Sequence, residues 1–92
     1  MRRVEYTGQF RKDVKRIQRR GKDIDQLKLL MRLLVEGSPL PEQYQDHPLK
    51  GQWIGVRDAH IKGDWLLLYS LTDADTVVRF ERTGSHSDLF DE

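Results

Sequence analysis

The sequence contains no cysteine, which excludes disulfide bonds and thiolate metal sites. It has no apolar run long enough to cross a membrane, and the residues that follow Met1 are polar and charged rather than the apolar core of a signal peptide. A chain of 92 residues can bury one modest hydrophobic core. We therefore expect a single cytoplasmic domain over residues 1–92, without association with a membrane.

Motifs of two common kinds of enzyme site are also missing. The three histidines, at positions 47, 60 and 86, show neither the i, i+4 spacing of a helical zinc site nor a Cys/His pattern. The chain also lacks the nucleophile-elbow motif of serine hydrolases. We therefore expect no bound metal and no cofactor. Acid–base catalysis by histidines remains, because the pKa of an imidazole lies close to neutrality.

The net charge of +1 hides an uneven distribution of charge along the chain. Residues 1–32 hold eleven Lys and Arg against four Asp and Glu, whereas residues 33–92 hold five basic and eleven acidic residues. A basic half is typical of a domain that binds nucleic acid or another anionic partner, but helices with solvated basic faces give the same pattern.

Apolar periodicity predicts two helices in the first 37 residues. We expect a short edge strand over residues 2–6 and then a helix, capped by Thr7, that runs to about Arg20. Asp23 is expected to cap a second helix, which ends at Gly37. Because a short turn joins them, the two helices should form an antiparallel hairpin with their apolar stripes in the core.

Three strand-like runs follow a loop over residues 38–52 that is rich in proline and glycine. The runs cover residues 53–61, 65–71 and 76–82, and the connections between them are short enough for hairpins. After a turn at Gly84, the chain is expected to end in a short helical or irregular segment. The predicted fold is α+β: a small antiparallel β-sheet packed against an N-terminal two-helix hairpin.

The turn between the first two predicted strands contains a histidine and a carboxylate. A tight turn at Lys62-Gly63 would bring His60 near Asp64 or Trp65. A carboxylate beside an imidazole raises the imidazole pKa and fixes its tautomer. The pair is also explained by an ordinary surface hydrogen bond.

The end of the last predicted strand carries a second pair of reactive groups. His86 follows four residues after Arg82, with Gly84 between them to turn the chain. A guanidinium can bind phosphate oxygens while an imidazole gives or takes a proton, as phosphoryl chemistry requires. An ion pair of Arg82 with Glu81 or Asp88 is the structural alternative.

Several blocks of sequence, in this order, resemble the YafQ-type toxins of the RelE/ParE superfamily, and the resemblance covers essentially the whole chain. The blocks are residues 44–53 (YQDHPLKGQW), Arg57-Asp58-Ala59-His60, Asp64-Trp65 and residues 80–86 (FERTGSH), with Leu89-Phe90. The opening EYTGQF and KDVK segments are similar as well. Ser85 stands where we expect threonine in the family, a mild difference.

The resemblance implies a RelE-like fold and a ribosome-dependent mRNA interferase, the toxin of a type II toxin–antitoxin system. It implies neutralisation by a DinJ/RelB-like antitoxin, with operator DNA contacted only through that antitoxin. The implied catalytic residues are His47, His60, Asp64, Arg82, His86 and Phe90. Trp65 and Lys50 are the implied substrate contacts. The basic face of the first helix, with Arg16, Arg19 and Arg20, is then expected to contact ribosomal RNA.

The implied chemistry is attack of the RNA 2′-hydroxyl on the adjacent phosphate. His86 is assigned as the general acid and His60, oriented by Asp64, as the base. His47 is a second base or a phosphate contact, and the choice of base between His47 and His60 stays open. Phe90 would hold a base by stacking, or else fix the tail as a hydrophobic plug.

Two other functions remain open at this stage. A ParE-like toxin inhibits DNA gyrase without catalysis, and the histidines would have no role in such a protein. A plain nucleic-acid-binding module would use the basic helices and show salt-sensitive binding without turnover.

Overall fold

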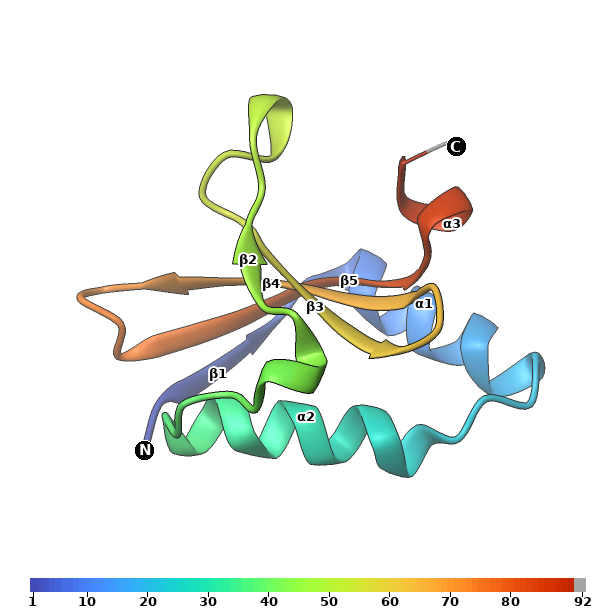
Figure 1. The fold of residues 1–92 in the computed structure, drawn as a ribbon, viewed down its shortest axis with the longest axis horizontal. Coiled ribbons are helices and arrows are strands. Elements are labelled where there is room, and N and C mark those ends of the chain that lie inside the picture. Colours follow the sequence, from blue (N-terminus) through green and yellow to red (C-terminus); the bar gives the residue numbers. More distant parts are fainter. Residues whose placement is uncertain (91–92) are drawn as a thin grey trace.

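The structure is a computed structural model, and it describes residues 1–90 (Figure 1). In chain order the elements are β1 (Arg3–Tyr6), α1 (Gly8–Arg19), α2 (Ile24–Glu36), the 3-10 turn η1 (Glu42–Tyr44), β2 (His47–Pro48), the 3-10 turn η2 (Gly51–Trp53), β3 (Arg57–Lys62), β4 (Trp65–Thr72), β5 (Val77–Ser85) and α3 (His86–Phe90). The predicted α+β class is confirmed. Within the described residues, no helix has the length and apolar character needed to span a membrane.

The five strands form one sheet in the order β1-β5-β4-β3-β2. The predicted antiparallel meander of β3, β4 and β5 is confirmed. The predicted edge strand exists as well, but β1 runs parallel to β5, with Arg3 opposite Val77 and Tyr6 opposite Phe80. The sheet is therefore mixed rather than purely antiparallel. Two parallel strands need a long connection, and the segment from α1 to β4 forms the connection between β1 and β5.

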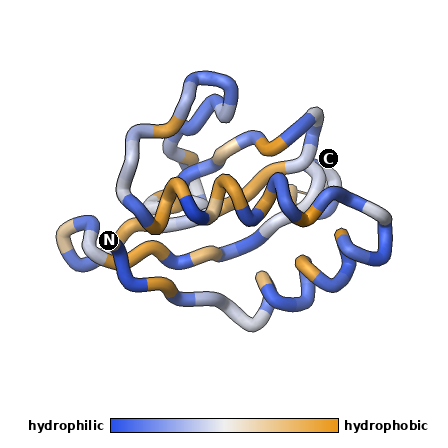
Figure 2. The backbone as a smooth tube through the Cα atoms, turned by 90° about the horizontal axis from the view of Figure 1, so that it is seen from below, coloured by the Kyte–Doolittle hydropathy of each residue, from blue (hydrophilic) through white to orange (hydrophobic). Residues whose placement is uncertain are grey.

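The two predicted helices begin and end where their capping residues stand. The Thr7 hydroxyl accepts a hydrogen bond from the Phe10 amide at 2.9 Å, and the Asp23 carboxylate accepts one from the Asp25 amide at 3.0 Å. Gly37 ends α2 in the left-handed conformation, with a φ of 79° that glycine adopts without strain. From the turn that joins them, α1 and α2 run apart over one face of the sheet (Figure 2).

Strand β4 is buried on both faces, which accounts for its nearly continuous apolar sequence. Trp65, Leu67 and Tyr69 belong to the core cluster that α1 and α2 cover. Leu66 and Leu68 belong to a second cluster on the other face, covered by α3 and by side chains from residues 49–56. The helix hairpin thus protects one face, and the smaller elements only partly cover the other.

The segment before β3 departs most from the prediction. The loop over residues 38–52 contains a two-residue strand, β2, which pairs with β3. Regular strand structure begins only at Arg57, not at residue 53. Gly51 and Gly55 have φ angles of 66° and 89°, which turn the chain away from the sheet. Figure 1 shows this segment projecting beyond the sheet.

Candidate active site

Three structural elements bring the three histidines together on the sheet face away from α1 and α2. His47 lies on β2, His60 on β3, and His86 at the start of α3. The ring centroids of His47 and His60 are 6.1 Å apart, and those of His60 and His86 are 6.0 Å apart. The structure thus brings together the three histidines that the sequence analysis named as candidate catalytic residues. At these distances a phosphate group could contact more than one imidazole.

Asp58 is the carboxylate at the centre of this cluster. Its two oxygens lie 3.8 Å from Nε2 of His47 and 3.9 Å from Nε2 of His60, and the residue is 3% exposed. Burial raises the pKa of the Asp58 carboxyl, and the rings of His60, His47 and His86 oppose that shift. The distances are too long for direct hydrogen bonds but short enough for Asp58 to stabilise a protonated ring.

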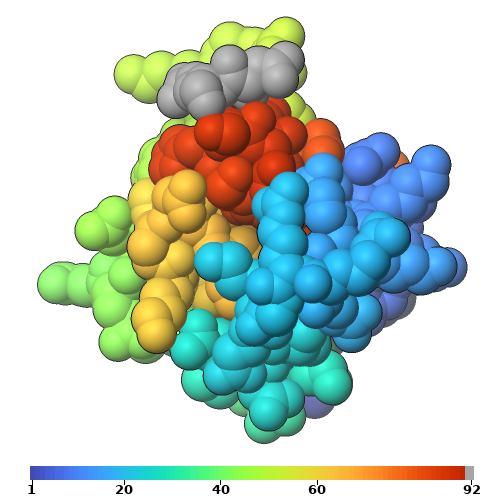
Figure 3. All heavy atoms as spheres, turned by 90° about the vertical axis from the view of Figure 1, so that its right-hand side faces the viewer, coloured from blue at the N-terminus to red at the C-terminus, as the bar shows by residue number. Residues whose placement is uncertain are grey.

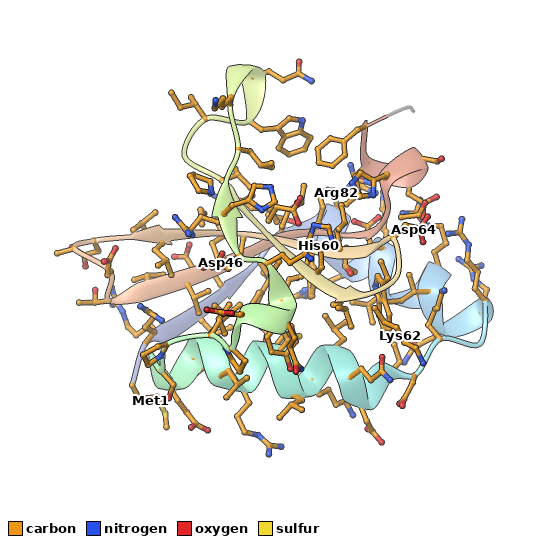
Figure 4. All side chains as sticks on the ribbon, viewed as in Figure 1. Met1, Asp46, His60, Lys62, Asp64 and Arg82 are labelled. Atoms are coloured by element: carbon orange, nitrogen blue, oxygen red, sulfur yellow. The ribbon has the colours of Figure 1, made fainter. Side chains whose placement is uncertain are left out.

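The predicted contact between His60 and Asp64 is wrong. His60 pairs with Leu66, and a register shift then places Lys62 opposite Trp65, so that Asp64 lies exposed in the turn (Figure 4). Within residues 1–90, Asp58 is the carboxylate within 4.0 Å of a His60 ring nitrogen. The sequence could have predicted the contact between Asp58 and His60, because residues two positions apart in a strand point to the same face of the sheet.

Trp65 is also not placed to contact a substrate. It is 3% exposed, and its indole nitrogen donates a hydrogen bond to the Thr83 hydroxyl at 2.9 Å. The side chain belongs to the core beneath the helix hairpin, so the prediction that it touches RNA is wrong. The side chains of Lys50 and Phe90, which were also predicted to contact RNA, are more exposed than that of Trp65. Lys50 is exposed at the start of η2, and Phe90 is half-buried, edge-on to Trp53 at 5.8 Å.

The backbone before His47 is anchored by a network that sequence reasoning missed. Arg57 donates two hydrogen bonds of 3.1 Å to the carboxylate of Asp46, which also accepts one from the Tyr69 hydroxyl. The His47 Nδ1 atom lies 2.7 Å from the Gln45 carbonyl oxygen. Because a carbonyl only accepts, Nδ1 carries the hydrogen in this contact and Nε2 faces Asp58. The network therefore orients the ring nitrogen that can exchange a proton.

Arg82 is held by a buried carboxylate on α1 rather than by Glu81 or Asp88. Its Nε and Nη2 atoms donate to Asp13 at 2.7 and 3.2 Å, and Asp13 is 1% exposed. Residue pairing places Arg82 opposite Leu68 on β4, which is itself opposite Asp58 on β3. Two of the five guanidinium N–H donors are used by Asp13.

Helix α3, which carries His86, is fastened to α1 through Asp88. Arg20 donates two hydrogen bonds to the Asp88 carboxylate, at 2.6 and 3.1 Å, and the Ser85 amide donates a third at 2.9 Å. The hydrogen bonds from Arg20 hold the pKa of Asp88 well below its usual range, so the ion pair stays charged wherever histidines titrate. Figure 3 shows α3 seated against the end of α1.

Gly84 leaves the space that this contact between helices needs. A Cβ atom at this position would lie 3.0 Å from the Asp88 side chain and 3.1 Å from Nη2 of Arg16. Any larger residue would push these side chains apart. The glycine expected to turn the chain is instead part of β5 and serves close packing.

Two of the three arginines predicted to bind ribosomal RNA are engaged within the molecule. Arg20 binds Asp88, and Arg16 donates to Asp13 at 3.0 Å with Asp88 3.9 Å away. Arg19 is exposed at the end of α1. Arg16 and Arg20 thus position α3, whatever they contact outside the molecule.

The family resemblance implies RNA cleavage with His86 as the general acid; on that hypothesis Arg20→Gln is expected to slow cleavage, because α3 would lose the ion pair that holds His86. Small displacements of a catalytic group reduce rates by roughly ten- to a hundredfold. Arg19→Gln removes the same charge from the same helix without touching Asp88, and should retain nearly full activity. Rates for both variants on ribosome-bound mRNA make the comparison. Equal losses would show that these arginines act through binding and not through α3.

His47, Asp58 and His60 also form a set of groups that could hold a metal ion. One ligand atom from each lies within 4.8 Å of the others. Two imidazoles and a carboxylate are a ligand set that zinc and copper accept. The expectation of no metal site rested on spacing along the chain, whereas these ligands meet through the pairing of β2 with β3.

Residues 2–91 match the family described as "Bacterial toxin of type II toxin-antitoxin system, YafQ", and the chain belongs to this family of toxins. The mRNA interferase toxin YafQ of Escherichia coli K12 is 56% identical over 88 residues, which cover 95% of this chain and 94% of that protein. The predicted family resemblance is therefore confirmed.

Solved structures show the same fold. The toxin in a crystal structure of the E. coli DinJ-YafQ complex has a TM-score of 0.89 and 55% identity, and the match covers 98% of this chain and 99% of that one. A crystal structure of a metal-bound toxin from Helicobacter pylori has a TM-score of 0.89 and 37% identity, with 98% and 100% covered.

Proposed function

We propose that this protein is a ribosome-dependent endoribonuclease that cleaves mRNA by histidine acid–base catalysis, as the toxin of a type II toxin–antitoxin pair. The observation that carries the proposal is the cluster of three imidazoles around the buried Asp58 carboxylate. The 56% identity to an mRNA interferase supports it. Its partners would be a DinJ/RelB-like antitoxin, the ribosome and mRNA, which implies action in the cytoplasm; operator DNA would be contacted only through the antitoxin.

In the proposed reaction, a base removes the proton of the RNA 2′-hydroxyl, which attacks the adjacent phosphate. His60 or His47 serves as the base. Asp58 is the carboxylate beside the base, in place of Asp64, which the sequence analysis expected there. His86 protonates the departing 5′-oxygen. Arg82 stabilises the charge on the phosphorane through donors that Asp13 leaves unused. The products carry a 2′,3′-cyclic phosphate and a 5′-hydroxyl.

Two residues near the histidines would hold the RNA. Phe90, partly exposed beside His86 at a ring distance of 6.0 Å, would stack on a base. Lys50 would contact a phosphate from the projecting segment. A ParE-like inhibitor of gyrase would not need three clustered imidazoles, so the histidine cluster favours the enzyme.

The test is cleavage of an mRNA on purified ribosomes. We expect cleavage only when ribosomes are present, and none when the nucleotide that provides the attacking hydroxyl is replaced by its 2′-deoxy form. Cleavage of the deoxy substrate would contradict the proposed chemistry. Inhibition of DNA supercoiling by gyrase, without RNA cleavage, would support the ParE-like function instead.

We further propose that catalysis needs no metal, although the His47–Asp58–His60 set could bind one. A metal would occupy the imidazole lone pairs that proton transfer requires. Added zinc should therefore inhibit cleavage, and a chelator that spares the ribosome's magnesium should reverse the inhibition. Asp58→Asn should weaken the inhibition by zinc. Loss of cleavage after selective zinc removal, with recovery on zinc addition, would overturn the metal-free mechanism.

A further inference from the structure

Trp53 is an aromatic residue near the histidines to which the proposed reaction gives no role. It lies in the projecting segment, residues 49–56, and its ring stands perpendicular to that of Phe90, with the centroids 5.8 Å apart and an angle of 88° between the planes. Figure 1 shows the projecting segment and α3 rising on the same side of the sheet. Trp53 is partly exposed, unlike Trp65, which is buried beneath the helices.

The ring of Trp53 ends a continuous series of rings that begins at the histidines. The centroid of His47 lies 6.1 Å from that of His60, which lies 6.0 Å from that of His86. The Phe90 ring is a further 6.0 Å from His86, and Trp53 follows it. The aromatic pair is therefore joined to the histidine cluster through His86, the proposed general acid.

The backbone of the projecting segment holds Trp53 in a defined place. The Leu49 amide donates to the Val56 carbonyl at 2.9 Å and closes the base of the segment, while the Val56 amide donates to the Trp53 carbonyl at 3.0 Å. The side chains of these three residues and of Phe90 pack against the second core cluster. A ring that is fixed before the substrate arrives loses little conformational entropy when it binds.

We propose that Trp53 and Phe90 form a corner that binds the base of the nucleotide on the 3′ side of the cleaved bond. This assignment rests on the proposed ribonuclease function, in which His86 protonates the 5′-oxygen of that nucleotide. Two perpendicular rings present a flat face and an edge, so a planar base can stack on one ring and meet the other without separating them. Trp53 then makes the substrate contact that the family resemblance implied for the buried Trp65.

Packing alone does not require an aromatic ring at position 53. Leu49 and Val56 of the same segment reach the second core cluster with aliphatic side chains. A partly exposed indole offers a surface that any base can use, because every base has a π-face. The Trp53 amide donates to the Lys50 carbonyl at 3.3 Å, so an exposed ammonium group belongs to the same turn and can contact the RNA backbone.

The test is a double-mutant cycle between the protein and its substrate. Wild type and Trp53→Ala each cleave two ribosome-bound mRNAs, one intact and one that lacks the base 3′ to the cut. The abasic nucleotide does not carry the attacking 2′-hydroxyl, so the reacting groups are unchanged. For the wild type, we expect the missing base to lower kcat/KM about ten- to a hundredfold, the usual contribution of one aromatic–base stack. Trp53→Ala should be about tenfold slower on the intact mRNA and respond only weakly to removal of the base.

Leu49→Ala is the matched control, because Leu49 packs on the same cluster from the same segment but has no ring. This variant should keep the full response to the missing base. Trp53→Phe should recover most of that response, since a phenyl ring still stacks. An mRNA that lacks the base on the 5′ side of the cut should cost the wild type and Trp53→Ala the same factor. Thermal unfolding shows that each variant is folded.

An equal penalty for the missing 3′ base in the wild type and in Trp53→Ala would overturn the proposal, because the ring would then act only through packing or through ribosomal RNA. Loss of the response in Leu49→Ala would overturn it as well, by showing that the placement of the segment matters and not the ring. Wild-type protein that fails to cleave even the intact mRNA would contradict the proposed ribonuclease function itself, not the base contact alone.

Discussion

His86→Ala is expected to cut ordinary mRNA about 10²- to 10⁴-fold more slowly than the wild type, yet at nearly the wild-type rate when sulfur replaces the departing 5′-oxygen. An alkoxide leaves slowly until it is protonated, whereas a thiolate leaves without an acid. His86 stands at the start of α3, where its ring centroid lies 6.0 Å from that of His60. The measurement is single-turnover cleavage of both substrates on ribosomes.

His60→Ala and His47→Ala are the matched controls for this experiment, because one of these two histidines is the proposed base. A variant without the base should stay slow on both substrates, because its defect lies in activating the 2′-hydroxyl. Antitoxin binding and thermal unfolding establish that each variant is folded. If the sulfur substrate fails to rescue folded His86→Ala, the acid is His47 or a group of the RNA or ribosome.

Asp13→Ala is expected to lower the free energy of unfolding by about 3–5 kcal/mol, the range for removing one partner of a buried ion pair. The Asp13 carboxylate accepts hydrogen bonds from Arg82, Arg16 and the Thr83 amide. Without it, the Arg82 guanidinium, whose side chain is 21% exposed, and the buried Thr83 amide would lose their acceptor. Chemical denaturation followed by circular dichroism measures the change.

Asp25→Ala serves as the control, because Asp25 is an exposed carboxylate in the first turn of α2. Its loss should lower the free energy of unfolding by less than about 1 kcal/mol. If Asp13→Ala were as stable as this control, the carboxylate would not be the main support of Arg82. The cleavage rate of Asp13→Asn then tests whether Arg82 is still held in place. The Asn side chain keeps the shape of Asp but lacks its negative charge.

Much of the architecture was predictable because local chemistry specifies it. Thr7, Asp23 and Gly37 mark the ends of the helices as expected, because each cap acts on a backbone group only two or three positions away. The apolar run of β4 and its short turns predicted the meander. The direction of β1 was not predictable, because four exposed residues carry no pattern that favours parallel or antiparallel pairing.

The candidate site shows the same limit. The family blocks identified the three histidines and Arg82, but the carboxylates that support them were missed or misassigned. Asp13 meets Arg82 across 69 residues of sequence. The predicted turn places Asp64 close to His60 along the chain, but strand register decides which side chains share a face, and it places Asp58 beside His60 instead. Contacts between residues that lie far apart in the sequence cannot be predicted from the pattern of a short stretch of residues.

The pairing of β1 with β5 limits when this protein can complete its fold during synthesis. Thr7, at the end of β1, donates to Glu81 across 74 residues, so the sheet edge and the Asp13–Arg82 contact form only after β5 has been synthesised. Synthesis proceeds at about 5–20 residues per second. His86 and the α3 anchor come later still. A nascent chain that halts before β5 leaves the ribosome without the proposed catalytic centre, and only translation carried almost to completion releases a molecule that contains it.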